Sequence, residues 1–554
     1  MKRLLPVLWF LLVALLVTWP VVLHPVDSVV GHAQTSTGSH VWVLWWAQNH
    51  LSQVQTDLIF FPHGADVVQL YGSDLLSPVL LGRLPLPPTT LHNLWAWTLL
   101  TVGALGTFLL CRNRGASLAG ALLGGTVFAT APFFQHELLN GTTEIVAAAA
   151  LPWLAWTLLN LLERPSPARG AAVGLVTGLA VLASAYNLFF AVLLGLCVLV
   201  WRLATSTEPI FSRAMLGAGA SAAGVAGLFA APIAWLQLAH GATEVYSRRE
   251  DWMNPELALP DSYATLLDWV DPRAASIPFD MAYPGGVIFE YWTTKTVYLG
   301  LAALALVVLA YVRRRGDGLF LGVLITGVLV AMGAWLRLDG APLTVMGHAI
   351  GLPSQLLAKS FPPFVVTAVH SYRYAALAVT GLAVLASLGL RRWRLVVPAL
   401  ALVILDAVIF SPVPWPAAIT PRPGGPVLEQ LAAAPDGAVL VAPIEGEHLG
   451  DLSLSLILQT VHGKPYQDGG IHRRAGADAT LLFEGNAVVE AMAAFGGPQL
   501  PGPDSRAKGF EHLRAIGYRY VLVRASSHEV LQWVYGELGN PSAKDDVWVL
   551  WVLG

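Results

Sequence analysis

The run LLPVLWFLLVALLVTWPVVLH, residues 4–24, decides the class of fold, because it is long, apolar and free of charged side chains. A helix needs about 20 such residues to cross the hydrocarbon core of a membrane. The basic start at Lys2 and Arg3 also suits a signal peptide, but no small-residue cleavage site follows soon after the run. We therefore expect an uncleaved first transmembrane helix.

The composition of the whole chain agrees with this first run. Of the 554 residues, 55% are hydrophobic and 12% are charged, whereas soluble domains contain about a quarter charged residues. A net charge of −3 provides no basic field for nucleic acid. Both cysteines, Cys111 and Cys197, fall inside predicted spans, which excludes a disulfide framework outside the membrane. The sequence predicts a polytopic α-helical membrane protein.

Further apolar runs give about eleven transmembrane helices in total. The expected spans are 4–24, 91–111, 116–135, 143–162, 170–185, 187–203, 214–238, 296–312, 318–336, 372–390 and 395–412. Segment 75–90 is also apolar, but four prolines interrupt it, so we expect a re-entrant or interfacial segment there.

Basic residues orient these spans. If the N-terminus is cytoplasmic, every connection predicted to lie inside contains arginine, as the positive-inside rule requires. These residues are Arg112, Arg114, Arg164, Arg169, Arg202, Arg213, Arg313, Arg314, Arg315, Arg391, Arg392 and Arg394. An odd number of spans then places the C-terminal part outside, in the periplasmic or extracellular space. We expect the cytoplasmic (inner) membrane of a bacterium.

This orientation divides the chain into three parts. Residues 1–412 form the transmembrane domain, and its long outside loops are 26–90, 240–293 and 337–371. Residues 413–436 form a proline-rich linker. Residues 437–554 form a small exterior α/β domain, because β-branched runs such as GAVLVAPI alternate there with short amphipathic segments.

The outside loop that includes residues 26–74 contains four histidines and four aspartates among tryptophans. Asp57 lies between apolar residues, where a carboxylate can have a raised pKa and act as a general base, although a turn-capping role explains it equally well. His40 and His63 are candidates to bind a metal or a phosphate with Asp57. Their spacing matches no metal-ligand motif, so we expect no metal cofactor.

Other candidates follow later in the chain. Arg248 and Arg249 suit a clamp on a lipid phosphate, or ion pairs with neighbouring acids. Arg373 either reaches the interface or faces an outward cavity. Glu144 starts a helix, where the helix dipole already favours a carboxylate, and it is also close to the expected cavity. Asp406 lies inside the last span, in a capping or a functional role.

Several segments resemble the GT-C superfamily of integral membrane glycosyltransferases. They are GSHVWVLWW and TDLIFFPHG in the first loop, NGTTEIVAAAALPWLAW, SYRYAALAVTGLAVLASLGL, and TVHGKPYQDGG, LRAIGYRYVLV and KDDVWVLWVL near the C-terminus. The resemblance extends over essentially the whole chain. It implies a GT-C-like fold and a polyprenyl-phosphate sugar as donor.

The resemblance also implies an acidic residue in the first outside loop that acts as base toward the acceptor. That acid is expected shortly before the tryptophans, but here the position contains Ser36, Thr37 and Ser39. Asp57, later in the loop, or Asp27, earlier, would then take its place.

The resulting hypothesis is a glycosyltransferase that acts at the outer face on an acceptor glycan, lipid or protein. Asp57 would be the base, and Arg248 and Arg249 would hold the donor phosphate. His40, Glu144 and Arg373 would line the site, and membrane lipid would surround it. The alternatives are a non-catalytic relative that binds a lipid-linked sugar, and a lipid-sugar transporter or flippase. The almost entirely apolar inner halves of the spans argue against transport.

Overall fold

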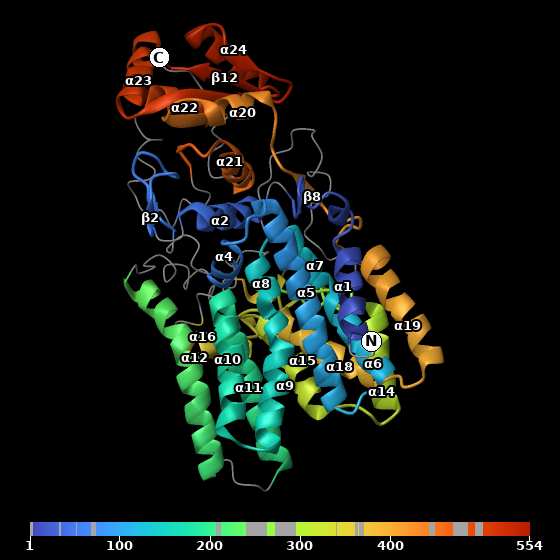
Figure 1. Cartoon of the computed structure of the whole chain (residues 1–554). Helices are drawn as coiled ribbons and strands as arrows, with labels where there is room; N and C mark the ends of the chain where they lie inside the picture. Colours follow the sequence, from blue (N-terminus) through green and yellow to red (C-terminus); the bar gives the residue numbers. More distant parts are fainter. Residues whose placement is uncertain are drawn as a thin grey trace.

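The protein is a helical bundle with a small sheet domain at one end (Figure 1). The computed structural model describes residues 4–32, 35–50, 53–67, 74–206, 212–239, 263–271, 295–338, 341–360, 364, 370–442, 449–468, 486–493 and 502–553. In this part of the chain, seven helices are long and apolar enough to cross a membrane, and four shorter apolar helices accompany them. Together they match the eleven expected spans.

The bundle is made of helices that run between its two ends. They are α1 (Leu5–Val17), α5 (Pro88–Asn113), α6 (Leu118–Ala129) with α7 (Pro132–Leu139), α8 (Thr143–Val146) with α9 (Leu151–Glu163), α10 (Pro167–Ala183), α11 (Tyr186–Thr205), α12 (Arg213–Ala239), α14 (Leu301–Val312), α15 (Gly318–Ala331), α18 (Ala375–Leu388) and α19 (Trp393–Leu405). Prolines begin several of them: Pro88, Pro132 and Pro167 occupy first-turn positions, where their missing N–H is not needed.

Helix α18 is the centre of the bundle, because every residue from Ser371 to Leu388 is buried. Small residues allow its neighbours to approach closely. A side chain at Gly381 would meet the backbone of Leu324 in α15, and one at Gly327 in α15 would meet the backbone of Ala378. Such small-residue contacts are how helices pack where lipid provides no hydrophobic driving force.

Asp406 stabilises this bundle rather than lining a cavity. It begins a short π-helical turn (Asp406–Phe410) at the end of α19 and is buried. Its carboxylate accepts hydrogen bonds from the Tyr298 hydroxyl and from the backbone N–H of Ala302, both at 2.8 Å. Ala302 is in the first turn of α14, so Asp406 caps that helix from a neighbouring chain segment.

The first outside loop folds over the end of the bundle. It contains β1 (Ser28–Val30), α2 (Thr37–His50), the hairpin of β2 (Gln55–Thr56) and β3 (Ala65–Asp66), and α4 (Leu76–Leu81). The proline-broken segment 75–90 thus forms a short helix and a turn before α5. The later loop that was expected at 337–371 contains the hairpins β4–β5 (Arg337–Leu338, Ala341–Pro342) and β6–β7 (Thr344–Val345, His348–Ala349), α16 (Pro353–Ser360) and the turn η6 (Ser371–Tyr374).

The C-terminal region is a four-stranded mixed sheet with helices. Its strands are β9 (Ala438–Ala442), β10 (Tyr518–Arg524), β11 (Ala543–Lys544) and β12 (Trp548–Val552), in the order β11-β12-β10-β9. β9 and β10 are parallel, and β12 is antiparallel to β10. The helices are α20 (Pro426–Ala433), α21 (Leu449–His462), α22 (Ala487–Ala493), α23 (Pro503–Ala515) and α24 (His528–Leu538). An outlying strand, β8 (Ile419–Pro421), pairs with β1.

The first loop joins the C-terminal region to the bundle. Trp42 of α2 is fully buried and donates a hydrogen bond to the Gln459 side chain of α21 at 2.5 Å. Phe60 and Phe61, after β2, donate backbone hydrogen bonds to residues 468 and 466, and the Tyr518 hydroxyl donates to the Phe61 carbonyl at 2.8 Å. The tryptophan-rich stretch therefore serves mainly to hold two parts of the molecule together.

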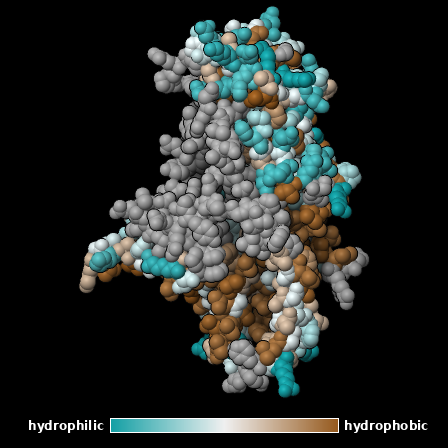
Figure 2. All heavy atoms as spheres, turned by 90° about the vertical axis from the view of Figure 1, so that its left-hand side faces the viewer, coloured by the Kyte–Doolittle hydropathy of each residue, from teal (hydrophilic) through white to brown (hydrophobic). Residues whose placement is uncertain are grey.

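The outer surface of the bundle suits a membrane. Large side chains on the bundle helices are exposed, for example Leu228 and Val312 at about three quarters of their surface (75% and 73%). Figure 2 shows hydrophobic residues over the lower part of the molecule and hydrophilic residues over the C-terminal region. The chain is thus a multi-pass membrane protein.

Candidate functional site

Ionisable side chains from five segments meet where the first loop covers the bundle. His40 comes from the first turn of α2, Asp74 from the residues before α4, and His92 from the first turns of α5. Glu144 comes from α8, and Arg373 from the turn η6 that begins the α18 span. We call these five residues the outer cluster. Asp74, His92, Glu144 and Arg373 are buried, at no more than 8% exposed surface.

Two glycines allow α2 to approach the bundle closely enough to form this cluster. Gly31 and Gly141 both have positive φ, at 121° and 71°, and a side chain on either would collide with Thr37 at the start of α2. The backbone N–H of His32 and the hydroxyl of Thr35 both donate to the Leu139 carbonyl, at 2.9 and 3.1 Å. The start of α2 is therefore fixed against the turn that precedes Glu144.

His40 and Glu144 form an ion pair, with 3.0 Å between Nε2 and Oε2. Burial lowers the pKa of His40, but the Glu144 and Asp74 carboxylates outweigh this effect, so the pKa is raised above its ordinary value. A protonated His40 compensates the two buried acids. The His92 ring lies 6.5 Å from the His40 ring, and its Nε2 has no hydrogen-bond partner among the described residues.

Asp74 is the second acid beside His40. Its two carboxylate oxygens accept hydrogen bonds from the backbone N–H and the hydroxyl of Ser77, at 3.1 and 2.7 Å. Burial raises the pKa of Asp74 to about 6, while His40 and Ser77 act in the opposite direction. A carboxyl group with a pKa of about 6 is half-protonated at about pH 6 and mostly deprotonated at neutral pH, where it can accept a proton.

Arg373 supplies the fixed positive charge of the cluster. Its guanidinium group donates a hydrogen bond to the Tyr186 hydroxyl at 3.1 Å and lies over the Tyr186 ring at 5.1 Å. It also lies within 5.9 Å of the Tyr372 ring, and it interacts electrostatically with Glu137 and Glu144. The two tyrosines hold the guanidinium between them, so it has a defined direction.

A third acid, Glu137, extends the cluster along α7. Glu137 is fully buried and accepts a hydrogen bond from the Thr142 hydroxyl, and its Oε1 lies 3.8 Å from Nδ1 of His136. The buried acids and bases thus form a continuous polar region, from Asp74 through His40, Glu144 and Arg373 to Glu137. Charged groups inside a helical membrane bundle are costly, and they usually mark a functional site.

The structure brings together three of the six site residues expected from the sequence. His40, Glu144 and Arg373 are in the outer cluster. Asp57 is exposed in the turn after β2, beside the chain segment that contacts the C-terminal region, and it makes no contact with these three. Its role as base stays a prediction. Arg248 and Arg249 lie outside the described residues, and so does most of loop 240–293.

Sequence reasoning missed Asp74, His92, Tyr186 and Tyr372 as site residues. The pattern Asp74-x-x-Ser77 is typical of a helix start, and Asp74 does bind Ser77, so this signal concealed its second role. His92 looked like part of an apolar span. Only the tertiary structure brings Asp74 and His92 next to His40.

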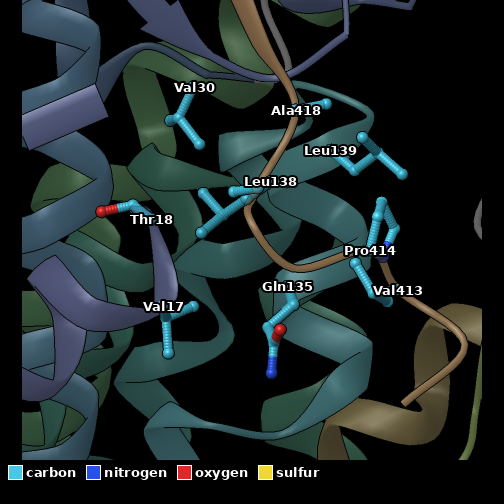
Figure 3. A pocket seen from close by; sticks show the side chains of 10 residues that line it. Val17, Thr18, Val30, Gln135, Leu138, Leu139, Val413, Pro414 and Ala418 are labelled. Carbon is cyan, nitrogen blue, oxygen red and sulfur yellow. The ribbon is translucent and has the colours of Figure 1, made fainter. Parts of the chain in front are cut away.

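The cavity between α1, α7 and the linker is not a substrate site. It measures about 10 Å³, which is room for about one water molecule. Figure 3 shows that Val17, Val30, Leu138 and Val413 give it mostly apolar walls. The one amide there, of Gln135, donates to the Thr130 carbonyl at 2.8 Å. The cavity is a small packing defect.

In the part of the chain that the structure describes, no three His, Cys, Asp or Glu side chains are grouped in a way that could hold a metal ion. The expectation of no metal cofactor stays a prediction.

Comparisons by sequence find no relative: no protein-family model matches the chain, and no curated protein does. Comparison with solved structures does find similar proteins. The arabinofuranosyltransferase AftD from Mycobacteria matches with a TM-score of 0.55 and 18% identity, over 95% of this chain and 35% of that chain. This chain therefore spans about a third of the length of AftD.

Two other solved structures match over nearly the whole chain, with lower scores. The oligosaccharyltransferase AglB from Archaeoglobus fulgidus, in complex with an inhibitory peptide and a dolichol-phosphate, has a TM-score of 0.45 and 11% identity, over 94% of this chain and 69% of that chain. ArnT from Cupriavidus metallidurans, bound to undecaprenyl phosphate, has a TM-score of 0.43 and 12% identity, over 99% of this chain and 98% of that chain.

The match to AftD concerns the fold, since the identity is low. It extends over the bundle and the C-terminal region together, with the first outside loop between them. The chain shares the fold of AftD, which is the GT-C type of fold that its sequence predicts.

Proposed function

We propose that this protein transfers a sugar from a polyprenyl-phosphate donor to an acceptor at the outer face of the membrane, and that the outer cluster is its active site. The observation that carries the proposal is the burial of Asp74, Glu144 and Arg373 around the partly exposed His40 at one end of a GT-C bundle. Acids and bases at this depth suit a reaction in which an anionic lipid leaves and a hydroxyl loses its proton. The periplasmic face of a bacterial cytoplasmic membrane fits the distribution of arginines.

In this reaction the acceptor hydroxyl oxygen attacks the anomeric carbon of the sugar. The bond between that carbon and the phosphate oxygen breaks, and polyprenyl phosphate leaves with the electron pair. Arg373 and protonated His40 would stabilise the phosphate, because a guanidinium group and an imidazolium both donate charge-assisted hydrogen bonds. Arg248 and Arg249, as the sequence predicts, would add to this clamp.

Asp74 is our choice for the base that receives the acceptor's proton. The GT-C resemblance implies an acid in the first outside loop, and this loop lacks one directly before Trp42. Asp74 comes from the other end of the same loop, is buried at 4% exposed surface, and faces the charge of His40. Asp57 and Asp27 are both exposed, so neither is shielded from water as the proposed reaction requires.

The experiment separates these acids. A strain that lacks the gene is complemented with wild type, Asp74→Asn, Asp57→Asn or Arg373→Lys, and the lipid-linked sugars and cell-envelope glycans are measured by mass spectrometry. We expect Asp74→Asn to lower product formation at least 100-fold, with accumulation of the donor lipid. Asp57→Asn should keep nearly wild-type product.

Binding is measured on the purified protein, with undecaprenyl phosphate as the probe and the shift in thermal unfolding as the readout. Asp74→Asn should still bind this lipid, since the base does not hold the phosphate. Loss of product in Asp57→Asn with normal product in Asp74→Asn would reverse the assignment. A wild type that binds undecaprenyl phosphate while deletion of the gene changes no glycan would indicate a non-catalytic lipid-binding relative.

A further inference from the structure

A second cavity lies at the opposite end of the bundle, where three turns meet. These turns join α5 to α6, α14 to α15, and α18 to α19, and the cavity between them has a volume of about 230 Å³. It is lined by Arg114, Gly115, Ala116, Ser117, Arg315, Ser387, Leu388 and Arg391. Three arginines from separate turns therefore surround one space.

The cavity carries a positive charge that the described residues neutralise only in part. Arg114 is compensated, because its Nε lies 2.8 Å from the Asp317 carboxylate and its guanidinium carbon lies 5.3 Å from the Trp201 ring centre. Arg315 and Arg391 are exposed, and neither side chain has a hydrogen bond or ion pair with any residue that the structure describes. Two guanidinium groups are thus available to an anion.

The cavity is separate from the outer cluster. His92 and Arg114 lie near the two ends of α5, 22 residues apart in sequence, which corresponds to roughly 33 Å along a helix. This is close to the thickness of the hydrocarbon core of a bilayer, about 30 Å. The two sites therefore lie at opposite membrane surfaces. Binding at the arginine-lined cavity is independent of the reaction proposed for the outer cluster.

Three exposed apolar residues, which we call the apolar rim, lie close in sequence to the cavity lining, and a soluble anion would not need them. Leu118 begins α6, Val312 ends α14 and Trp393 begins α19, and all three are close in sequence to a residue that lines the cavity. Their exposed fractions are 49%, 73% and 47%. A ligand with a charged head and a hydrocarbon tail would contact both the arginines and this rim.

We propose that this arginine cavity binds the phosphate of an anionic membrane lipid of the inner leaflet. The fork of a guanidinium group matches phosphate oxygens, and basic pockets between transmembrane helices on the cytoplasmic side suit anionic head groups. The volume is smaller than that of a drug-sized site and suits a head group. Helix α6, whose N-cap is the lining residue Ser117, adds the positive end of its dipole at the cavity.

The test uses the purified full-length protein, stripped of lipid in a neutral detergent. Native mass spectrometry measures the binding of phosphatidylglycerol, of zwitterionic phosphatidylcholine and of inorganic phosphate. The variant is the double substitution Arg315→Gln and Arg391→Gln. Its control is Arg314→Gln with Arg392→Gln, which removes the same charge from the neighbouring exposed positions that do not line the cavity.

We expect wild type and the control to prefer phosphatidylglycerol over phosphatidylcholine, and the cavity variant to bind phosphatidylglycerol about 30-fold more weakly. Each arginine near an anionic surface contributes about a factor of five. An equal loss in both double variants would show a diffuse basic surface and would overturn the proposal. Binding of inorganic phosphate as tight as that of the lipid would point to a soluble anion and would overturn it too.

Discussion

The two ends of α5 carry charge in opposite ways. At its start, near His92, buried acids are compensated by Arg373 and by the partly exposed His40, which lies 3.0 Å from Glu144. At its end, near Arg114, positive charge predominates: Asp317 compensates Arg114, whereas Arg315 and Arg391 are exposed and have no partner among the described residues. Burying charge demands a partner of opposite sign, whereas exposed charge needs only water or a ligand. The charges at the start of α5 are held in place by their partners in the fold. The arginines at its end remain available to a ligand.

This comparison predicts that substitutions in the outer cluster affect stability strongly. The largest effect is expected for Arg373→Ala, because Glu137 and Glu144 then lose their fixed positive partner. The free energy of unfolding should fall by about 3–5 kcal/mol, the usual effect of leaving a buried charge uncompensated. Chemical unfolding in detergent measures it. Arg373→Lys, which keeps the charge but loses the stacking on Tyr186, should lie between wild type and Arg373→Ala; equal stability of all three would contradict the compensated cluster.

The next effect is pH-dependent and concerns Asp74. Its folded-state pKa of about 6 lies above the ordinary value of 3.8. Its contribution to stability is therefore fully present below about pH 3.8 and is lost as the pH rises through 6. Between pH 4 and 6, wild type should lose up to about 3 kcal/mol relative to Asp74→Asn.

Thermal unfolding at a series of pH values tests this, and the exposed Asp27→Asn is the control. Its curve should run parallel to that of wild type. If Asp74→Asn also follows the wild-type pH dependence, Asp74 is not desolvated in the cluster. His40, whose pKa is raised, should lose its own contribution at higher pH, above about 6.5, in all of these variants.

A smaller effect is expected where α2 of the first outside loop contacts α21 of the C-terminal region. Trp42→Phe removes the hydrogen bond to Gln459 and leaves the buried side-chain oxygen of Gln459 without this donor, which should cost about 1 kcal/mol. Hydrogen exchange should become faster in α21 and in the turn after β2. Trp45→Phe, on the same helix but partly exposed, is the matched control and should leave exchange unchanged. Equal protection in both variants would show that the Trp42 bond does not hold the C-terminal region in place.

The smallest effect is expected at the inner end. The double substitution Arg315→Gln and Arg391→Gln should change the free energy of unfolding in neutral detergent by no more than about 0.5 kcal/mol, because both side chains are exposed and have no ion pair with the described residues. A loss comparable to that of Arg373→Ala would remove the difference between the two ends of α5.

The sequence predicted the bundle well for a simple physical reason. Crossing a membrane requires length and apolarity, and both are local properties of the chain. All eleven predicted spans coincide with helices, and the arginines of three predicted inside turns meet around one cavity. The strands β9 and β10 also lie where β-branched runs were found.

The site was harder to predict, because it depends on contacts between distant segments. Hydropathy placed His40, Glu144 and Arg373 at one face of the membrane, but nothing local to Asp74 distinguishes it from a helix cap. For Asp57, an apolar setting suggested a functional acid, whereas Ile59 and Phe60 beside it pack on the C-terminal region instead. The apolar neighbours of a loop residue do not reveal which surface they will cover.

The burial of α18 on all sides has a consequence for the lipid around the protein. Arg373 stands at its outer end, and Leu388 at its inner end lines the arginine cavity. The 18 residues between Ser371 and Leu388 fix a length of roughly 27 Å. Gly381 and Gly327 bring the backbones of α18 and α15 into close contact. Because of this contact, α18 cannot tilt independently of α15 when the bilayer thins or thickens. Acyl chains must stretch or compress to match the bundle, so hydrophobic mismatch would be borne by the lipid rather than by the protein.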